Sequence, residues 1–257
     1  MYQFFVESSQ INIEQKIVII TGSDVNHIKN VLRMKTGEEV SISNGYDGRE
    51  YRCAVLELNE SDVVLELRFI KEEGNELPVE VTLFQGLPKA DKMELIIQKC
   101  VELGVTKIVP VSMKRCVVRL DDKKSASKTA RWQSIAEAAA KQSKRGIIPG
   151  VSQVMSFEEA LRDASGYDVK LLPYEMADND AMDRTRDIFT GLKPGQKIAV
   201  FIGPEGGFDE KEIEKACDLG MQIVTLGKRI LRTETAGMTV MSWIAFTTEG
   251  TGKEDRP

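Results

Sequence analysis

Residues 198–246 constrain the fold of this chain more than any other segment. Two short runs rich in β-branched and apolar residues, 198–202 and 223–226, each stop at a glycine, Gly203 or Gly227. Such runs are typical of buried strands whose following loops lie at the carboxyl edge of a sheet. In open α/β sheets, small ligands bind at that edge. We therefore expect the loops after the two strands to form one ligand site.

An alternation of strands and helices extends back to residue 81, which predicts that the larger part of the chain is an α/β domain. Strands are expected at 81–85, 107–111, 169–172, 197–202 and 222–226, and helices at 91–103, 125–143, 157–164, 210–219 and 235–247. Strands that alternate with helices form a mostly parallel sheet covered on both faces.

Residues 4–70 follow a different pattern, typical of a small β-barrel. The expected elements are one helix, capped by Ser23 or Asp24 and running to about Met34, and five short strands at 4–6, 16–20, 39–43, 51–56 and 63–67. The polar segment 71–78 contains Gly and Pro and is the best candidate for a domain boundary. We predict one domain at 1–72 and a second at 73–257.

Composition excludes several classes of protein. The 257 residues are 42% apolar and 29% charged, as in an ordinary globular protein, and no run approaches the length of a membrane span. The first residues have no basic region, so no signal peptide is expected and the protein is predicted to be cytoplasmic. Four dispersed cysteines predict structural thiols. The single histidine, His27, excludes zinc sites with two histidines, and no metal site is predicted.

Positive charge is concentrated in one segment. Residues 107–145 contain 11 Lys or Arg and 3 acidic residues, whereas the whole chain has a net charge of −5. A basic segment in an acidic protein indicates an anionic partner at one face. A solvated surface helix with its preceding loop explains the same composition equally well, and composition leaves both interpretations open.

The loop 203–207 matches no nucleotide-binding motif, since neither G-x-x-x-x-G-K-[ST] nor G-x-G-x-x-G occurs in the chain. Asp209 and Glu212 are expected to form a capping box at the start of the next helix, which occupies backbone donors and repels phosphate. A neutral or cationic ligand suits this loop better than a nucleotide. A capped helix after a tight turn, without a ligand, is the simpler alternative.

The last predicted helix has no charged residue from 236 to 246, so we expect it to be buried almost all round. Arg232 and Glu234 precede it. Charges at the mouth of a buried element are costly unless they are paired or used. A structural ion pair between these two residues is the alternative to a functional role.

Several segments, taken in order, resemble one enzyme family. Residues 202–208 (IGPEGGF) and 226–236 (LGKRILRTETA) are similar to the SPOUT class of S-adenosylmethionine-dependent methyltransferases. More narrowly, they resemble the family that methylates N3 of a uridine in 16S rRNA of the small ribosomal subunit. Segments 27–33 (with Gly37), 88–94, 99–104 and 137–145 match further motifs of this family, whereas Gln3 and Cys116 depart from its usual residues.

The resemblance implies a SPOUT trefoil-knot domain with a mostly parallel sheet, preceded by a PUA-like RNA-binding β-barrel. It also implies a homodimer that acts in rRNA processing and ribosome biogenesis, with S-adenosyl-L-methionine as cofactor. The residues that it implies for the cofactor pocket are Leu172, Pro173, Tyr174, Glu175, Ile202, Gly203, Pro204, Glu205, Gly206, Gly207, Leu226, Gly227, Ile230, Leu231, Arg232, Thr235 and Ala236.

Methylation of uridine N3 needs a base, because this nitrogen carries a proton and is a poor nucleophile until the proton leaves. We predict that Arg232 stabilises the developing uracil anion and that Glu234 or Glu205 is the base. The residues predicted to contact RNA are Arg33, Lys89, Lys92, Lys114, Arg115, Arg119, Arg131, Lys141 and Arg145. The alternatives are a SPOUT methyltransferase acting at another RNA position, and a non-catalytic RNA-binding or ribosome-assembly protein.

Overall fold

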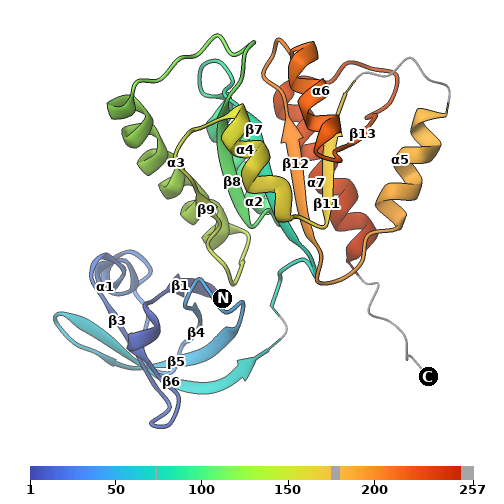
Figure 1. The fold of residues 1–257 in the computed structure, drawn as a ribbon. Coiled ribbons are helices and arrows are strands. Elements are labelled where there is room, and N and C mark those ends of the chain that lie inside the picture. Colours follow the sequence, from blue (N-terminus) through green and yellow to red (C-terminus); the bar gives the residue numbers. More distant parts are fainter. Residues whose placement is uncertain (73, 175–179, 250–257) are drawn as a thin grey trace, which may run out of the picture. The chain divides into compact units, whose positions relative to one another are not determined.

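The computed structural model describes residues 1–72, 74–174 and 180–249. The chain forms two compact units (Figure 1). The N-terminal unit comprises Met1–Glu76 and Ala140–Ile148, and the C-terminal unit comprises Leu77–Ala139 and Pro149–Pro257. Nothing in the sequence assigned Ala140–Ile148 to the first unit, so the chain passes between the units three times instead of once.

One curled six-stranded sheet forms the N-terminal unit, in the order β1-β4-β5-β6-β3-β2. Its strands are β1 (Tyr2–Phe5), β2 (Ile11–Asn12), β3 (Ile17–Thr21), β4 (Glu39–Ser43), β5 (Glu50–Leu58) and β6 (Asp62–Lys71). The pair β1–β4 is parallel and the other pairs are antiparallel. Alternate residues such as Val18, Ile20 and Val63 point into its core. The five predicted strands are confirmed, and β2, only two residues long, was not predicted.

The predicted helix at 23–34 is shorter and less regular than expected. Helix α1 (Ser23–Asn26) continues as a π-helical segment, η2 (His27–Val31), and Gly22 is the N-cap residue. The predicted cap at Ser23 or Asp24 is therefore wrong, because Gly22 adopts a positive φ of 76° that starts the helix one residue earlier. A short 3₁₀ helix, η1 (Ser8–Gln10), precedes β2.

The C-terminal unit contains a seven-stranded sheet in the order β10-β8-β7-β12-β11-β13, with β9 also paired to β8. Its strands are β7 (Glu80–Gly86), β8 (Lys107–Ser112), β9 (Gly150–Val151), β10 (Met155–Ser156), β11 (Val169–Pro173), β12 (Lys197–Ile202) and β13 (Gln222–Val224). Every pair is parallel, which confirms the predicted α/β sheet. The central strands β7 and β12 are almost completely buried, and the rings of Phe84 and Phe201 stack with centroids 4.4 Å apart.

Helices cover both faces of this sheet. They are α2 (Lys92–Glu102), α3 (Asp122–Gln142), α4 (Phe157–Asp163), α5 (Ala181–Thr190), α6 (Glu210–Asp218) and α7 (Thr233–Thr248), with a 3₁₀ turn, η3 (Ala164–Gly166), after α4. In Figure 1, α4 and α6 lie in front of the sheet and α7 lies behind it, where α7 packs against both α2 and α5. Helix α5 was not predicted. Among the described residues, no helix is both long and apolar enough to cross a membrane.

Helix α7 is buried along one face only, which corrects the expectation that it is enclosed almost all round. Gly237, Val240, Met241 and Ile244 face the core, whereas the side chain of Phe246 is 84% exposed. The outer face is uncharged but not wholly apolar, since Thr235 and Ser242 are exposed together with Phe246. Helix α5 covers part of the remaining surface, where the rings of Phe189 and Trp243 lie 5.4 Å apart.

Candidate functional site

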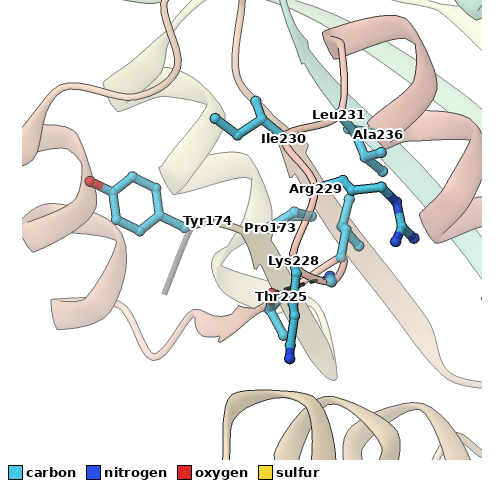
Figure 2. Close-up of a pocket in the computed structure, with 10 residues that line it drawn as sticks. Pro173, Tyr174, Thr225, Lys228, Arg229, Ile230, Leu231 and Ala236 are labelled. Carbon is cyan, nitrogen blue, oxygen red and sulfur yellow. Dashed lines mark hydrogen bonds between the residues drawn. The ribbon is translucent and has the colours of Figure 1, made fainter. Parts of the chain in front are cut away.

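Two adjoining cavities lie at the carboxyl ends of β11, β12 and β13, entirely within the C-terminal unit. The smaller one, of about 200 Å³, lies between the end of β11 and the loop after β13 (Figure 2). The larger one, of about 770 Å³, lies between the loop after β12 and the segment that enters α7. Five residues line both cavities: Pro173, Tyr174, Ile230, Leu231 and Ala236. The two glycine-marked loops therefore meet around one continuous hollow.

Most of the residues predicted for the cofactor pocket line these cavities. They are Pro173, Tyr174, Ile202, Gly203, Pro204, Glu205, Gly206, Gly207, Leu226, Gly227, Ile230, Leu231, Arg232 and Ala236. Leu172 is buried in β11, and Thr235 is exposed on α7 away from the lining. Glu175 lies outside the described residues. The lining also includes residues that were not assigned to the pocket: Lys92, Arg115, Phe208, Thr225, Lys228, Arg229 and Thr233.

Close packing of backbone at Gly86 brings the 203–207 loop against the end of β7. A Cβ atom at Gly86 would lie 2.7 Å from both the backbone nitrogen and Cδ of Pro204, which is far inside van der Waals contact. Only glycine lets the two segments approach this closely. The loop after β13 depends on another glycine, Gly227, whose φ of 99° is unfavourable for any residue with a side chain.

A buried hydrogen-bond chain ties the same loop to the start of α7. The Thr233 hydroxyl donates to the carbonyl oxygen of Gly203 (2.7 Å) and accepts from Nε2 of Gln85 (2.9 Å). Gln85 is fully buried at the end of β7, and its Nε2 also donates to the carbonyl oxygen of Gly86. Sequence reasoning missed both residues. One feature of the sequence could have indicated Gln85, because it is a lone glutamine at an otherwise apolar strand end. Burying its amide is costly unless the amide forms hydrogen bonds.

One lysine joins the two carboxylates that were predicted as candidate bases. Lys92 Nζ lies 3.0 Å from Glu205 Oε1 and 3.3 Å from Glu234 Oε2. The backbone N–H of Lys89 donates to Glu205 (3.1 Å). The buried Oε2 of Glu234 accepts no hydrogen bond from the described residues, although it lies within ion-pair distance of Lys92. Lys92 and Glu205 line the larger cavity, whereas Glu234 is not among the residues that line it.

Lys92 stabilises the ionised form of the Glu205 carboxyl. Burial alone would raise the pKa of the Glu205 carboxyl, but hydrogen bonds from backbone N–H groups and from Lys92 outweigh it and lower the pKa below its ordinary value. The hydrogen bond with Glu205 is the main cause that raises the pKa of Lys92. At neutral pH both groups are charged. Lys92 was predicted to contact RNA, and the structure instead surrounds it with acids.

The predicted capping box at α6 is confirmed. The Asp209 side chain accepts from the backbone N–H of Lys211, and the Glu212 side chain accepts from the backbone N–H of Asp209. Lys114 forms an ion pair with Asp209 (2.9 Å), and the hydrogen bond between them is the main cause that lowers the pKa of Asp209. The box places two carboxylates at the start of α6, directly after the 203–207 loop.

Several of the basic residues predicted to contact RNA already have partners. Arg131 pairs with Glu94 (2.7 Å), and Lys141 pairs with Asp24 (3.6 Å). Arg119 donates to the carbonyl oxygens of Met113 and Lys114. Arg33, Lys89 and Arg115 are exposed. The RNA contacts of this set stay a prediction.

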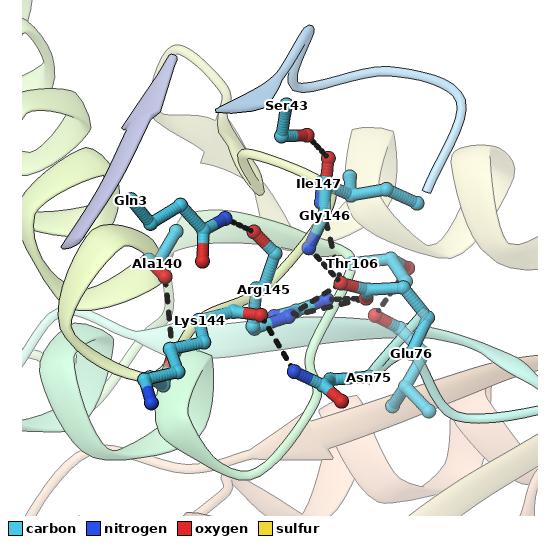
Figure 3. Close-up of polar contacts among 12 residues, drawn as sticks. Gln3, Ser43, Asn75, Glu76, Thr106, Ala140, Lys144, Arg145, Gly146 and Ile147 are labelled. Carbon is cyan, nitrogen blue, oxygen red and sulfur yellow. Dashed lines mark hydrogen bonds and ion pairs between the residues drawn. The ribbon is translucent and has the colours of Figure 1, made fainter. Parts of the chain in front are cut away.

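Arg145 is the least accessible of the predicted RNA contacts, with its side chain 2% exposed (Figure 3). Its guanidinium pairs with Glu76, and the backbone N–H groups of Gly146 and Ile147 donate to the same carboxylate (3.0 and 3.2 Å). Gln3, which departs from the family pattern, donates to the carbonyl oxygen of Arg145 (2.7 Å). These contacts clip Ala140–Ile148 onto the N-terminal unit, an environment that does not favour a phosphate contact.

The cysteines have structural surroundings. Cys53, Cys100 and Cys116 are buried free thiols, and Cys217 is exposed. Burial raises the pKa of Cys53 and of Cys100 to about 12, so both stay protonated at neutral pH. In the described part of the chain, no group of three His, Cys, Asp or Glu side chains is arranged to bind a metal.

Comparison with known proteins gives matches over nearly the whole chain. The model of an RNA methyltransferase domain matches residues 75–245, and that of an RNA methyltransferase PUA domain matches residues 20–68. Ribosomal RNA small subunit methyltransferase E of Bacillus subtilis (strain 168) is 38% identical over 251 residues, which cover 97% of this chain and 98% of that protein. The protein of the same name from Mesomycoplasma hyopneumoniae is 35% identical and covers 94% of this chain and 98% of its own length.

A solved structure agrees with these matches. The crystal structure of a ribosomal RNA small subunit methyltransferase E from Neisseria gonorrhoeae, bound to S-adenosyl methionine, superposes with a TM-score of 0.77 at 34% identity. The alignment covers 94% of this chain and 95% of that chain.

Proposed function

Since this chain belongs to the RNA methyltransferase family of ribosomal RNA small subunit methyltransferase E, we propose that it transfers a methyl group from S-adenosyl-L-methionine to 16S rRNA. The acceptor is N3 of one uridine in the small ribosomal subunit. The observation that carries the proposal is the continuous hollow at the carboxyl edge of the sheet, in a fold shared with a relative crystallised with the methyl donor. Because the proposed substrate is ribosomal, we propose that the enzyme acts in the cytoplasm.

The hollow fits the donor. Its larger cavity, of about 770 Å³, lies within the roughly 300–1,000 Å³ range of small-molecule sites. Glycines and a proline line the 203–207 side, so backbone groups are available to bind adenine, ribose and methionine moieties. The carboxylates of Glu205 and Glu234 suit a cationic sulfonium, and the capped start of α6 discourages phosphate.

When bound, S-adenosyl-L-methionine supplies an electrophilic methyl group and retains the electron pair of the broken carbon–sulfur bond. The protein must align the acceptor nitrogen, exclude water and take up the N3 proton. Arg232 lines the larger cavity with an exposed side chain, and it is placed to stabilise the uracil oxygens as the ring becomes anionic.

Of the two candidate bases, Glu205 is the one that borders the cavity, and we assign it the proton from N3. Its lowered pKa keeps the carboxylate ionised at neutral pH, which is the form that accepts a proton, although the same shift makes it a weaker base. Glu234 then acts through Lys92, whose ammonium it helps to hold beside Glu205. This assignment separates the two carboxylates into a proton acceptor and a positioning residue.

The outer face of α7 supports a homodimer as the working form. Phe246 and Trp243 from α7, with Met182 and Phe189 from α5, line an apolar groove of about 310 Å³. A second copy of the chain would cover this groove.

We also propose that α7 belongs to a trefoil knot, that residues 1–72 form the RNA-binding domain and that residues 73–257 form the methyltransferase domain.

The test is methyl transfer from radiolabelled S-adenosyl-L-methionine to small subunits purified from cells that lack the protein, followed by mapping of the modified nucleotide. We expect one N3-methyluridine in 16S rRNA. Label at another nucleotide would replace the proposed position, and donor binding without transfer to any subunit preparation would favour an assembly factor.

The base assignment is tested with Glu205→Gln and Glu234→Gln. We expect Glu205→Gln to lower kcat on the order of 10²-fold or more with little change in donor affinity. Glu234→Gln should lower it less. Near-normal turnover of Glu205→Gln would exclude that carboxylate as the base.

A further inference from the structure

The loop after Gly227 combines exposed cations with an exposed apolar side chain at the mouth of the hollow. Lys228 and Arg229 line the smaller cavity, Arg232 lines the larger one and Ile230 lines both. The Ile230 side chain is nevertheless 83% exposed. It therefore borders the hollow without being buried in it.

The cations of this loop differ from several basic residues elsewhere in the C-terminal unit, which are paired with acids. Arg131 and Lys114 each form an ion pair with an acid. In the parts of the chain that the structure describes, the side chains of Lys228, Arg229 and Arg232 have neither an ion-pair nor a hydrogen-bond partner. Their charge is thus available to a ligand.

Charge is zoned across the hollow. Around the 203–207 loop each cation has an acidic neighbour, because Lys92 lies between Glu205 and Glu234 and Arg115 lies 4.0 Å from Asp209. The loop after Gly227, by contrast, carries positive charge that has no acidic partner among the described residues. A cationic donor gains nothing from such a loop. An anion that approaches from outside does, and an RNA strand offers a phosphate at every nucleotide.

The position of Ile230 adds a reason for a nucleic acid. N3 of uridine lies on the edge that pairs with another base, so a uridine must leave its stack before N3 can enter a pocket. Proteins that separate stacked bases often insert an aliphatic side chain between them. An exposed isoleucine at a pocket mouth, beside cations that have no partner in the described part of the chain, has this chemistry.

We propose that residues 228–230 form an RNA-binding rim, in which Lys228 and Arg229 contact phosphates next to the target uridine and Ile230 packs against the bases left behind. This inference rests on the proposed function, because it assigns the rim to the substrate of that reaction. It adds contacts that neither the basic segment 107–145 nor the donor pocket supplies.

The first experiment measures KM for unmethylated small subunits and the affinity for S-adenosyl-L-methionine alone. Lys228→Ala/Arg229→Ala should raise KM roughly ten-fold and lower the slope of its salt dependence by about 1 per lost contact, with donor affinity unchanged. Lys197→Ala/Lys215→Ala is the matched control, since these exposed lysines pair with Glu80 and Glu158. The control should behave as wild type.

The second experiment addresses Ile230. Ile230→Ser should lower kcat/KM for small subunits, and Ile230→Met should restore most of it, while the mass measured by light scattering stays that of wild type. A changed mass would assign Ile230 to contact with a second copy, and a loss confined to donor affinity would assign it to the donor pocket. Either result overturns the proposal, as would an unchanged KM and salt slope in the double variant.

These outcomes are distinguishable from failure of the proposed function. If wild-type protein transfers no methyl group to small subunits, the function is wrong. If wild type is active and the rim variants match it, only the rim is wrong.

Discussion

Each unit contains one cluster of carboxylates and a cation: Glu76 with Arg145 in the N-terminal unit, and Glu205 and Glu234 with Lys92 in the C-terminal unit. The two clusters differ in burial and in how completely their hydrogen-bonding groups are satisfied. Both oxygens of Glu76 accept hydrogen bonds, and Arg145 is almost fully buried. Lys92 and Glu205, by contrast, are 29% and 27% exposed and border a cavity. The buried Oε2 of Glu234 has no hydrogen bond among the described residues.

A cluster whose hydrogen-bonding groups are all satisfied and buried holds chain segments together. A cluster that is partly exposed beside a cavity keeps hydrogen-bonding groups available for a ligand. Buried polar groups stabilise a structure when every member is satisfied, and an incomplete network usually has a functional reason. The first cluster should therefore control stability, and the second should control activity. Each of the following substitutions tests one side of that distinction.

Arg145→Met should have the largest effect on stability. Removing one partner of a buried pair leaves the other charge uncompensated, at a cost of about 3–5 kcal/mol. Arg49→Met is the matched control, since Arg49 pairs with Glu72 in the same unit but both side chains are exposed. Urea denaturation followed by circular dichroism measures the two. Equal small losses would show that the Glu76 cluster is not a structural clip.

Lys92→Met should lower turnover on the order of 10²-fold and cost less stability than Arg145→Met, because Lys92 is 29% exposed and Arg145 only 2%. The substitution removes the cation between two carboxylates beside the cavity. Lys99→Met on the same helix, where Lys99 pairs with Glu102, is the control and should keep normal turnover. A variant at Lys92 that loses stability but not activity would reverse the distinction between the clusters.

Gly86→Ala should destabilise the protein by about 1–3 kcal/mol and weaken donor binding, because the new methyl group forces the Pro204 loop away from β7. Gly150→Ala, also in a strand, meets no atom within 4 Å and should change neither property. Calorimetry of donor binding together with thermal unfolding tests whether the cluster around Lys92 depends on this close approach.

The smallest effect is on the pH dependence of stability. The pKa of Glu205 is lowered in the folded state, so its contribution is complete above the unfolded value of about 4.3 and is lost as pH falls through the folded value. The difference in unfolding free energy between wild type and Glu205→Gln should therefore shrink as pH is lowered from 6 to 3. A difference that stays constant would contradict the ion pair with Lys92.

Local pattern was sufficient for much of the fold. The strands of the parallel sheet end at Gly86, Gly203 and Gly227 or close to them, and their alternation with helices predicted both the sheet and the edge where the hollow lies. Helix α5 was not predicted because only Ala181, Thr185 and Phe189 form its buried face, which gives a weak apolar periodicity.

Partnerships between distant residues could not be predicted. A run of basic residues made Arg145 an RNA contact, but its environment is decided by Glu76, which is remote in the sequence. Lys92 likewise gained its two acidic neighbours only through the fold. Gln85 and Thr233 were overlooked for the same reason, because each is unremarkable until the ends of β7 and α7 meet.

The N-terminal unit is built from two segments of the chain that the ribosome synthesises at different times. Its strands are complete by Lys71, but the segment that supplies Arg145 belongs to a much later part of the chain. At about 5–20 residues per second, a ribosome needs several seconds to travel from Glu76 to Ile148. During that interval Arg145 has not been synthesised, so the carboxylate of Glu76 lacks its guanidinium partner. A chain truncated at residue 76 would lack the segment that supplies Arg145, and with it the buried partner of Glu76.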